Sequence, residues 1–159
     1  MTNRWWCAAA LALAACSSGG GAASEVHPAR TADATVQSFM KAVADSNLTT
    51  MASLWGTTSG PAGKTRQPAD YERRIAVMQA YLSNDDFRIL SDSPDGSEFR
   101  RAMQVQIRRQ ACTWDIPFTV IQLTDKTWII NQVDLAAAGN PAKPCNPSAK
   151  DTASAAGSP

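Results

Sequence analysis

The stretch Met103-Gln104-Val105-Gln106-Ile107-Arg108 alternates apolar with polar side chains. Successive side chains of a strand point to opposite faces of a sheet, so this alternation predicts a strand with one buried face and one solvated face. The next strand repeats the pattern, with apolar side chains at Trp114, Ile116, Phe118 and Val120. Ile121 and Leu123 then have the other parity, which predicts a bulge or a change of face in that strand.

Two further strands flank this pair. Residues 87–90 form a short strand candidate, and the turn signal Ser93-Pro94-Asp95-Gly96 separates them from the first alternating stretch. A second turn at residues 124–127 leads into a last strand at residues 128–133. Joined by short turns, the four strands predict an antiparallel sheet.

Upstream of the sheet the apolar period changes to that of helices. A first helix is predicted to begin at the N-cap Thr31, a second after Asn47 and a third at Pro68. Residues 56–67, between the second and third helices, have no apolar period and are predicted to form a loop. The predicted apolar stripes are Val36, Phe39, Met40 and Val43, then Leu48, Met51 and Trp55, then Tyr71, Ile75, Met78 and Leu82.

Three helices followed by four antiparallel strands resemble the nuclear transport factor 2-like (NTF2-like), or ketosteroid-isomerase-like and SnoaL-like, superfamily. Residues 39–55 look like the opening helix pair of small secreted members, and residues 125–133, with Trp128-Ile129-Ile130, are similar to their closing strand. The resemblance implies an α+β fold in which three N-terminal helices pack on a curved four-stranded sheet, forming a cone with an apolar pocket. Its members include enzymes, binding modules and lipoproteins, so the resemblance does not choose a function.

The amino terminus predicts export. Arg4 precedes an apolar run too short to span a bilayer, and small residues follow it, which is typical of a cleaved signal peptide at residues 1–15. The tetrapeptide Leu13-Ala14-Ala15-Cys16 resembles the lipobox of bacterial lipoproteins, which implies acylation of Cys16, with palmitate or similar chains. An ordinary export signal with a chance cysteine is the alternative.

The remaining segments divide the chain around one domain. Residues 16–30 predict a flexible tether, residues 31–135 one NTF2-like domain, and residues 136–159 a mostly disordered tail. Cys7 leaves with the signal and Cys16 is the predicted lipidation site. Cys112 and Cys145 therefore remain as a pair in an oxidising compartment, which predicts a disulfide that pins the tail.

The charge balance gives no reason to expect nucleic acid as a partner. The whole chain has 15 basic and 14 acidic residues, and removal of the signal takes only Arg4, which leaves a formal net charge of zero. Four arginines flank one predicted strand and form either a patch for anionic headgroups or a partner protein, or an ordinary solvated face. They are Arg100, Arg101, Arg108 and Arg109.

Few residues suggest catalysis. The only histidine, His27, lies in the tether, and no cysteine spacing or glycine-rich motif predicts a metal or a cofactor. A carboxylate in an apolar pocket could act as a general base, and the weak candidates are Asp70, Asp115 and Asp134. Large aromatic side chains either line a ligand pocket or pack in the core, and these are Trp55, Tyr71, Trp114, Phe118 and Trp128.

Three functional hypotheses follow. The first is a non-enzymatic, lipid-anchored extracytoplasmic domain that binds a small apolar ligand or an envelope protein. The anchor would lie in the cell membrane, or on the periplasmic side of the outer membrane in a Gram-negative host. The second is an isomerase-like or dehydratase-like enzyme with one cavity carboxylate as general base. The third is a structural envelope protein that forms a homodimer through its sheet.

Overall fold

A computed structural model describes residues 30–143 and Cys145. The predicted signal peptide, Cys16, the tether up to residue 29, and residues 144 and 146–159 of the tail lie outside the described residues. The helices are α1 (Ala32–Ala44), α2 (Leu48–Leu54), α3 (Ala62–Thr65), α4 (Tyr71–Leu82) and the 3-10 helix η1 (Leu135–Ala138). The strands are β1 (Gly56–Thr57), β2 (Gly60–Pro61), β3 (Asp86–Pro94), β4 (Arg100–Arg109), β5 (Cys112–Gln122) and β6 (Trp128–Val133).

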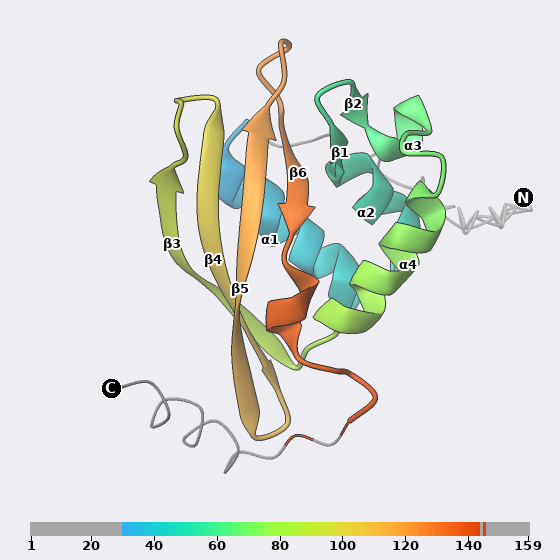
Figure 1. Cartoon of the computed structure of the whole chain (residues 1–159), viewed down its shortest axis with the longest axis vertical. Helices are drawn as coiled ribbons and strands as arrows, with labels where there is room; N and C mark the ends of the chain where they lie inside the picture. Colours follow the sequence, from blue (N-terminus) through green and yellow to red (C-terminus); the bar gives the residue numbers. More distant parts are fainter. Residues whose placement is uncertain (1–29, 144, 146–159) are drawn as a thin grey trace, which may run out of the picture.

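The large sheet has the strand order β3-β4-β5-β6, and every neighbouring pair is antiparallel. Figure 1 shows the strands curving around α1, with α2 and α4 beside β6 on the same side of the sheet. The predicted α+β class and four-stranded antiparallel sheet are therefore confirmed, and the element order agrees with the architecture that the resemblance implies.

The predicted alternation places one set of side chains in the core. Met103 pairs with Phe118 and Val105 pairs with Ile116, and all four side chains are buried. Ile107 is buried as well, whereas its partner Trp114 is only half-buried. The period of two was thus sufficient to identify the buried face of β4 and most of that of β5.

The sheet is irregular at two positions. The pairing of β3 with β4 shifts between Ile89 and Ser91, which leaves Leu90 without a partner on β4. The pairing of β5 with β6 shifts next to Val120, and there the extra residue is Asn131 of β6. The bulge predicted for β5 was therefore assigned to the wrong strand, because the extra residue lies on the partner strand, opposite the change of parity.

The first two helices begin where their caps predict. The Oγ1 atom of Thr31 accepts a hydrogen bond from the N–H of Ala34 at 3.2 Å, and Oδ1 of Asn47 accepts one from the N–H of Thr50 at 3.0 Å. The expected burial of Leu48 was wrong, because its side chain is 43% exposed. Only the later part of α2 packs against the core, through Met51, Ala52 and Leu54.

The segment predicted as a loop contains structure. β1 and β2 form a small hairpin in which Gly56 pairs with Pro61, and α3 follows directly. The third predicted helix, α4, begins at Tyr71 instead of Pro68. The reason is that the N–H of Tyr71 bonds to the carbonyl of Pro68 at 2.9 Å, so a turn precedes the helix. A side chain at Gly56 would meet backbone atoms of Gly60 and Ala62, so the hairpin requires glycine there.

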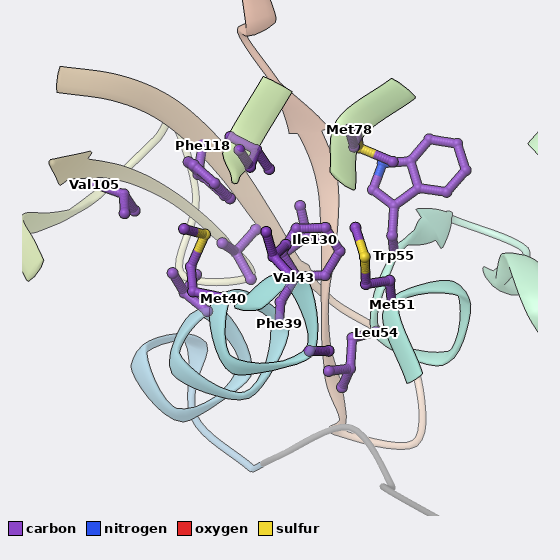
Figure 2. Packing of buried hydrophobic residues seen from close by; sticks show 14 of the residues in the cluster. Phe39, Met40, Val43, Met51, Leu54, Trp55, Met78, Val105, Phe118 and Ile130 are labelled. Carbon is purple, nitrogen blue, oxygen red and sulfur yellow. The ribbon is translucent and has the colours of Figure 1, made fainter. Parts of the chain in front are cut away.

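The core lies between α1, α2, α4 and the concave face of the sheet (Figure 2). Phe39 of α1 meets Phe118 of β5 edge-to-face, with 6.4 Å between ring centroids. The one buried polar side chain in the described part of the chain is Thr35. Its hydroxyl lies 2.9 Å from the carbonyl oxygen of Thr31 and 3.2 Å from that of Trp128, and it therefore links α1 to β6.

The end of the fold extends beyond the predicted boundary at residue 135. Asp134 accepts a hydrogen bond from the N–H of Ala136 at the start of η1, and Ala138 is buried. The predicted disulfide between Cys112 and Cys145 is confirmed, with 6.0 Å between the two Cα atoms. Within residues 30–143, every helix is too short or too polar to cross a membrane.

Candidate ligand-binding cleft

A half-open cleft with a volume of about 290 Å³ lies between α4 on one side and β6 with the start of η1 on the other. Five of its lining residues are apolar and five are polar or charged. The apolar residues are Trp55, Val77, Met78, Val133 and Leu135, and the polar ones are Asp70, Arg73, Arg74, Asn131 and Gln132.

The wall formed by α4 is a second stripe of that helix, which lies beside the core stripe and shares Met78 with it. Asp70, Arg73, Arg74, Val77 and Met78 are spaced i, i+3, i+4, i+7 and i+8, which places them along one side of a helix. Val77 is 40% exposed although it is apolar. The wall thus changes along α4 from charged side chains to apolar ones.

The opposite wall depends on the bulge in β6. The side-chain amide of Asn131, the bulged residue, donates a hydrogen bond to the carbonyl of Gly56 at 3.1 Å. Trp55, at the end of α2, forms an isolated parallel bridge with Ile130. Figure 2 shows its indole on the side of Met78, which also lines the cleft. Trp55 therefore connects the two walls.

The backbone of Val133 also faces this side. Val133 pairs with Phe118 of β5, and the N–H of Asp134 bonds to the carbonyl of Pro117. This pattern makes Val133 and Phe118 a non-hydrogen-bonded pair of the antiparallel ladder. The N–H and C=O of Val133 consequently point away from β5, toward the edge of the sheet that borders the cleft.

The side chains that line the cleft carry more positive than negative charge. Oδ1 of Asp70 accepts a hydrogen bond from Nε of Arg74 at 2.9 Å, and this bond is the main reason that the pKa of Asp70 is lowered from its ordinary value. Arg73 is exposed, and within residues 30–143 no carboxylate forms an ion pair with it. Two arginines and one aspartate give the lining a formal net charge of +1.

The three candidate carboxylates are not brought together. Asp70 lines the cleft, whereas Asp115 lies exposed on the outer face of β5, where it accepts a hydrogen bond from Gln106 at 2.7 Å. Asp134 is exposed and caps η1. A general base needs a raised pKa, and the pKa of Asp70 is shifted in the opposite direction. Among the described residues, no group of three or more His, Cys, Asp or Glu side chains is placed to hold a metal ion.

Of the five aromatic candidates, only Trp55 lines the cleft. Tyr71, Phe118 and Trp128 belong to the buried core. Trp114 is half-buried and lies under the guanidinium of Arg109, 4.8 Å from its ring. The five side chains therefore do not share one pocket within the described part of the chain.

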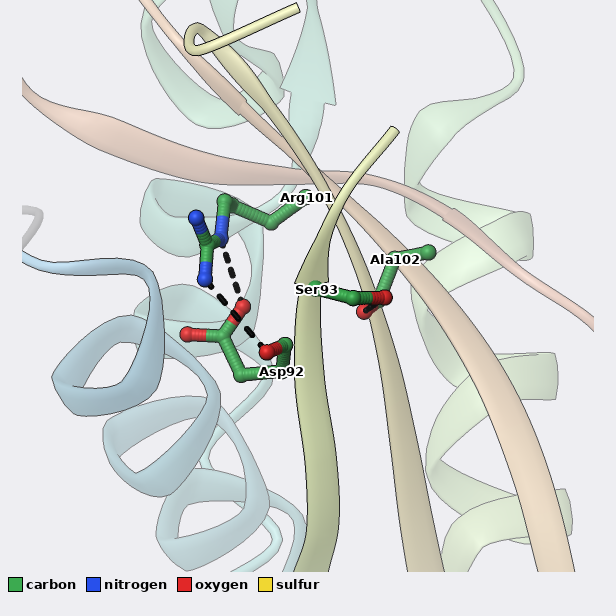
Figure 3. A network of polar contacts seen from close by, with 4 residues as sticks. All are labelled: Asp92, Ser93, Arg101 and Ala102. Carbon is green, nitrogen blue, oxygen red and sulfur yellow. Dashed lines mark hydrogen bonds and ion pairs between the residues drawn. The ribbon is translucent and has the colours of Figure 1, made fainter. Parts of the chain in front are cut away.

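The four arginines, which lie at the two ends of β4, do not form a basic patch. Arg100 is paired with Asp95 at 2.5 Å, and Arg108 lies 3.9 Å from Asp85. Arg101 is paired with Asp92 at 2.6 Å on the side of the sheet that faces α1 (Figure 3). Arg109 donates hydrogen bonds to backbone carbonyls. Each positive charge already has a partner within the protein, which favours the alternative of an ordinary solvated face over a patch that binds anionic groups.

Several cleft residues did not emerge from the sequence. Arg73 and Val77 follow from a second helical stripe along α4, which is visible in the sequence once the first stripe is assigned. Asn131 and Leu135 could not be found in this way. Their positions depend on the register of β6 and on η1, which are set by tertiary contacts.

No protein-family model and no curated protein matches the chain. Among solved structures, the chain is similar to a crystal structure described as an NTF2-like transpeptidase from Campylobacter jejuni, with 11% sequence identity and a TM-score of 0.46. The match covers 64% of this chain and 99% of that chain. A likeness of this degree says nothing about activity or substrate.

Proposed function

We propose that this protein is a lipid-anchored extracytoplasmic binding domain that holds a small ligand in the cleft between α4 and β6. The observation that supports it is the cleft itself, in which an aromatic and aliphatic wall meets a few polar groups on regular elements of the fold. Ligand sites in proteins commonly combine these features, and a volume of about 290 Å³ suits a small molecule better than a protein segment.

Two features support the extracytoplasmic location. The disulfide between Cys112 and Cys145 is of a kind that persists in oxidising compartments. The sequence around Cys16 resembles a lipoprotein signal, and acyl chains on that residue would hold the domain at a membrane surface without a transmembrane helix. No nucleic acid is expected as a partner.

The enzyme hypothesis receives less support. Asp70 is the carboxylate among the three candidates that reaches the cleft, and its bond to Arg74 favours the ionised form. An ionised carboxylate with a lowered pKa is a poor proton acceptor. A ligand that is bound and released unchanged is more consistent with this geometry than a substrate that loses a proton.

The anchor is tested by cell fractionation. Replacement Cys16→Ser removes the thiol that acylation requires, so we expect the protein to move from the membrane fraction to the soluble fraction. A Cys16→Ser protein that stays as membrane-bound as the parent would show that the anchor is wrong.

The cleft is tested on the same Cys16→Ser protein by mass spectrometry under native and denaturing conditions. We expect the native mass to exceed the denatured mass by a discrete small-molecule increment. Val77→Trp places an indole in the cleft and should abolish the increment. Ala76→Trp is the matched control, because Ala76 is exposed on the same helix and does not line the cleft. Equal masses in the parent, or an increment that survives Val77→Trp, would count against the cleft.

A further inference from the structure

We propose that the ligand of this cleft is an amphiphilic monocarboxylate, with its carboxylate held by Arg73 and its apolar body against Val77, Met78 and Trp55. This inference rests on the proposed binding function and names the chemical class of the ligand. It starts from the two arginines of α4, which differ in what they already bind.

Arg74 forms an ion pair with Asp70, and Arg73 interacts with the same carboxylate only weakly. The guanidinium of Arg74 is bonded to Asp70 at 2.9 Å, which neutralises both charges. Arg73 is the neighbouring cleft residue; its charge is the smallest of the causes that lower the pKa of Asp70, and within residues 30–143 its guanidinium forms no ion pair. A guanidinium has five donors in a fixed fork that matches the two oxygens of a carboxylate. The free positive charge therefore selects an anionic head group.

The net charge of the lining limits the charge of that head group. Arg73, Arg74 and Asp70 together carry a formal charge of +1. A carboxylate has one negative charge at neutral pH and balances this value. A phosphate monoester has about −1.5 to −2 and would place excess negative charge beside Asp70. Charge complementarity thus favours a monocarboxylate.

The apolar part of the cleft indicates that the rest of the ligand is apolar. Val77 lies one helical turn beyond Arg73, which corresponds to about 6 Å along the axis of α4. Its exposed side chain, with Met78 and the indole of Trp55, forms an apolar surface that a ligand would remove from water. The ligand should therefore have its first apolar groups about one helical turn from its carboxylate.

The experiment compares three probes that share one alkyl chain and differ in the head group: octanoate, octanamide and octylammonium. The full chain with Cys16→Ser is used, so that acyl chains on the protein itself do not compete for the cleft. Binding is measured from chemical-shift changes of the backbone amides in α4 and β6. We expect octanoate to bind roughly tenfold more tightly than octanamide, with octylammonium weakest, and the preference for octanoate to decrease as salt is raised.

Three variants test which residues cause the preference for octanoate over octanamide. Arg73→Gln should make octanoate and octanamide bind equally well. Arg108→Gln, the same change outside the cleft, should leave the preference intact. Asp70→Asn should strengthen octanoate binding several-fold, because it releases Arg74 and raises the formal charge of the lining to +2.

The outcomes separate this inference from the proposed function. Equal binding of octanoate and octanamide in the parent would overturn the carboxylate proposal and leave a binding cleft for a neutral ligand. Retention of the preference in Arg73→Gln would overturn the role of Arg73. The probes are used at concentrations too low for them to form micelles. Failure of all three probes to shift any cleft amide would then count against the binding function as well.

Discussion

Arg109 connects three elements through one side chain. Its guanidinium donates hydrogen bonds to the carbonyls of Ser83 at 2.9 Å and Tyr81 at 2.7 Å, at the end of α4. It also reaches the carbonyl of Ala138 at 3.2 Å, in η1. Carbonyls at a helix C-terminus lack partners within the helix and carry partial negative charge, so a cation is favourable there. Partial burial lowers the pKa of Arg109, and the charge of Asp85 offsets only part of this effect.

Replacement Arg109→Ala should lower the free energy of unfolding by about 2–3 kcal/mol, because several carbonyls lose a charged donor. The free energy of unfolding of Arg109→Lys should lie between those of Arg109→Ala and the parent, since an ammonium keeps the charge but loses the planar fork. Urea unfolding followed by circular dichroism measures both. Arg108→Ala, at an exposed position, is the control and should change stability by less than about 0.5 kcal/mol. An Arg109→Ala protein as stable as that control would contradict the role of Arg109.

Asp70 gives a prediction about pH. Its pKa in the folded protein lies below the ordinary value of 3.8, so its ion pair contributes stability above pH 4 that is lost as the pH falls through the lowered pKa. Asp70→Asn lacks this contribution, and the urea midpoints of the two proteins should therefore converge as the pH falls below the ordinary pKa of 3.8. The effect will be small, because both partners are about half exposed. Midpoints that diverge as the pH falls would contradict the assignment.

At this scale the sequence predicts local contacts better than distant ones. Thr31 and Asn47 were identified as caps because their partners lie three residues away. Arg109 was predicted to lie either in a surface patch or on an ordinary solvated face. Its partners lie 26 to 29 residues away and are backbone carbonyls, which every residue has. No feature of the sequence marks the particular carbonyls that a distant arginine will reach.

Among the elements, the β1–β2 hairpin lies next to two residues that line the cleft, Trp55 and Asn131. It follows Trp55 directly, and the carbonyl of Gly56 holds the amide of Asn131. A Cβ atom at Gly56 would lie 2.9 Å from the backbone N of Ala62 and in contact with the carbonyl oxygen of Gly60. Backbone atoms cannot rotate away as a side chain can, so the hairpin itself would have to move.

Gly56→Ala should therefore destabilise the protein by about 1–3 kcal/mol and shift the amide resonances of Trp55 and Asn131. Gly63→Ala is the matched control. The added methyl group would lie at 3.4 Å from atoms of Ala52, an ordinary contact, and alanine favours the helix α3. Chemical denaturation and amide spectra of both variants test the prediction, and equal stabilities would contradict it.

Periodicity predicted the long elements and missed the short ones. The stripes of α1 and α4 and the alternation of β4 extend over enough residues to show their period, and these residues are buried as expected. β1, β2 and α3 have between two and four residues, which is too short for a period to repeat. They exist because the hairpin packs against β6, and no local pattern requires them.

For the molecule as a whole, the disulfide holds the end of the fold to the start of β5. Cys112 and Cys145 are 33 residues apart, and the enclosed segment includes β5, β6 and η1. Closing a segment of this length restricts the unfolded chain and should contribute about 3–4 kcal/mol on the chain-entropy model.

The double variant Cys112→Ala, Cys145→Ala should therefore have a free energy of unfolding about 3–4 kcal/mol lower than that of the parent. Its urea midpoint should be lower accordingly. Addition of a reductant should lower the midpoint of the parent to that of the variant, and it should not change the variant. A parent whose midpoint is insensitive to a reductant that demonstrably opens the bond would contradict the predicted contribution.

The cleft is a property of the whole fold, and this explains why the sequence predicted it only in part. Trp55 and Asp70 were identified as candidates from their residue types. Their meeting with Arg73, Asn131 and Leu135 depends on how α4 lies against β6, which is decided by the core. The overall α+β fold could be predicted because it follows from patterns within each element.

Strand β3 is one edge of the large sheet, and no other described strand pairs with its outer side. Its ladder is interrupted at Leu90, charged side chains at Asp86, Arg88 and Asp92 lie along it, and Pro94 ends it. Such an edge is a poor template for the strand of another molecule. If the protein is lipid-anchored as we propose, copies at a membrane surface are concentrated in two dimensions, where open sheet edges favour pairing between molecules. The interrupted edge of β3 would let them stay separate at high surface density.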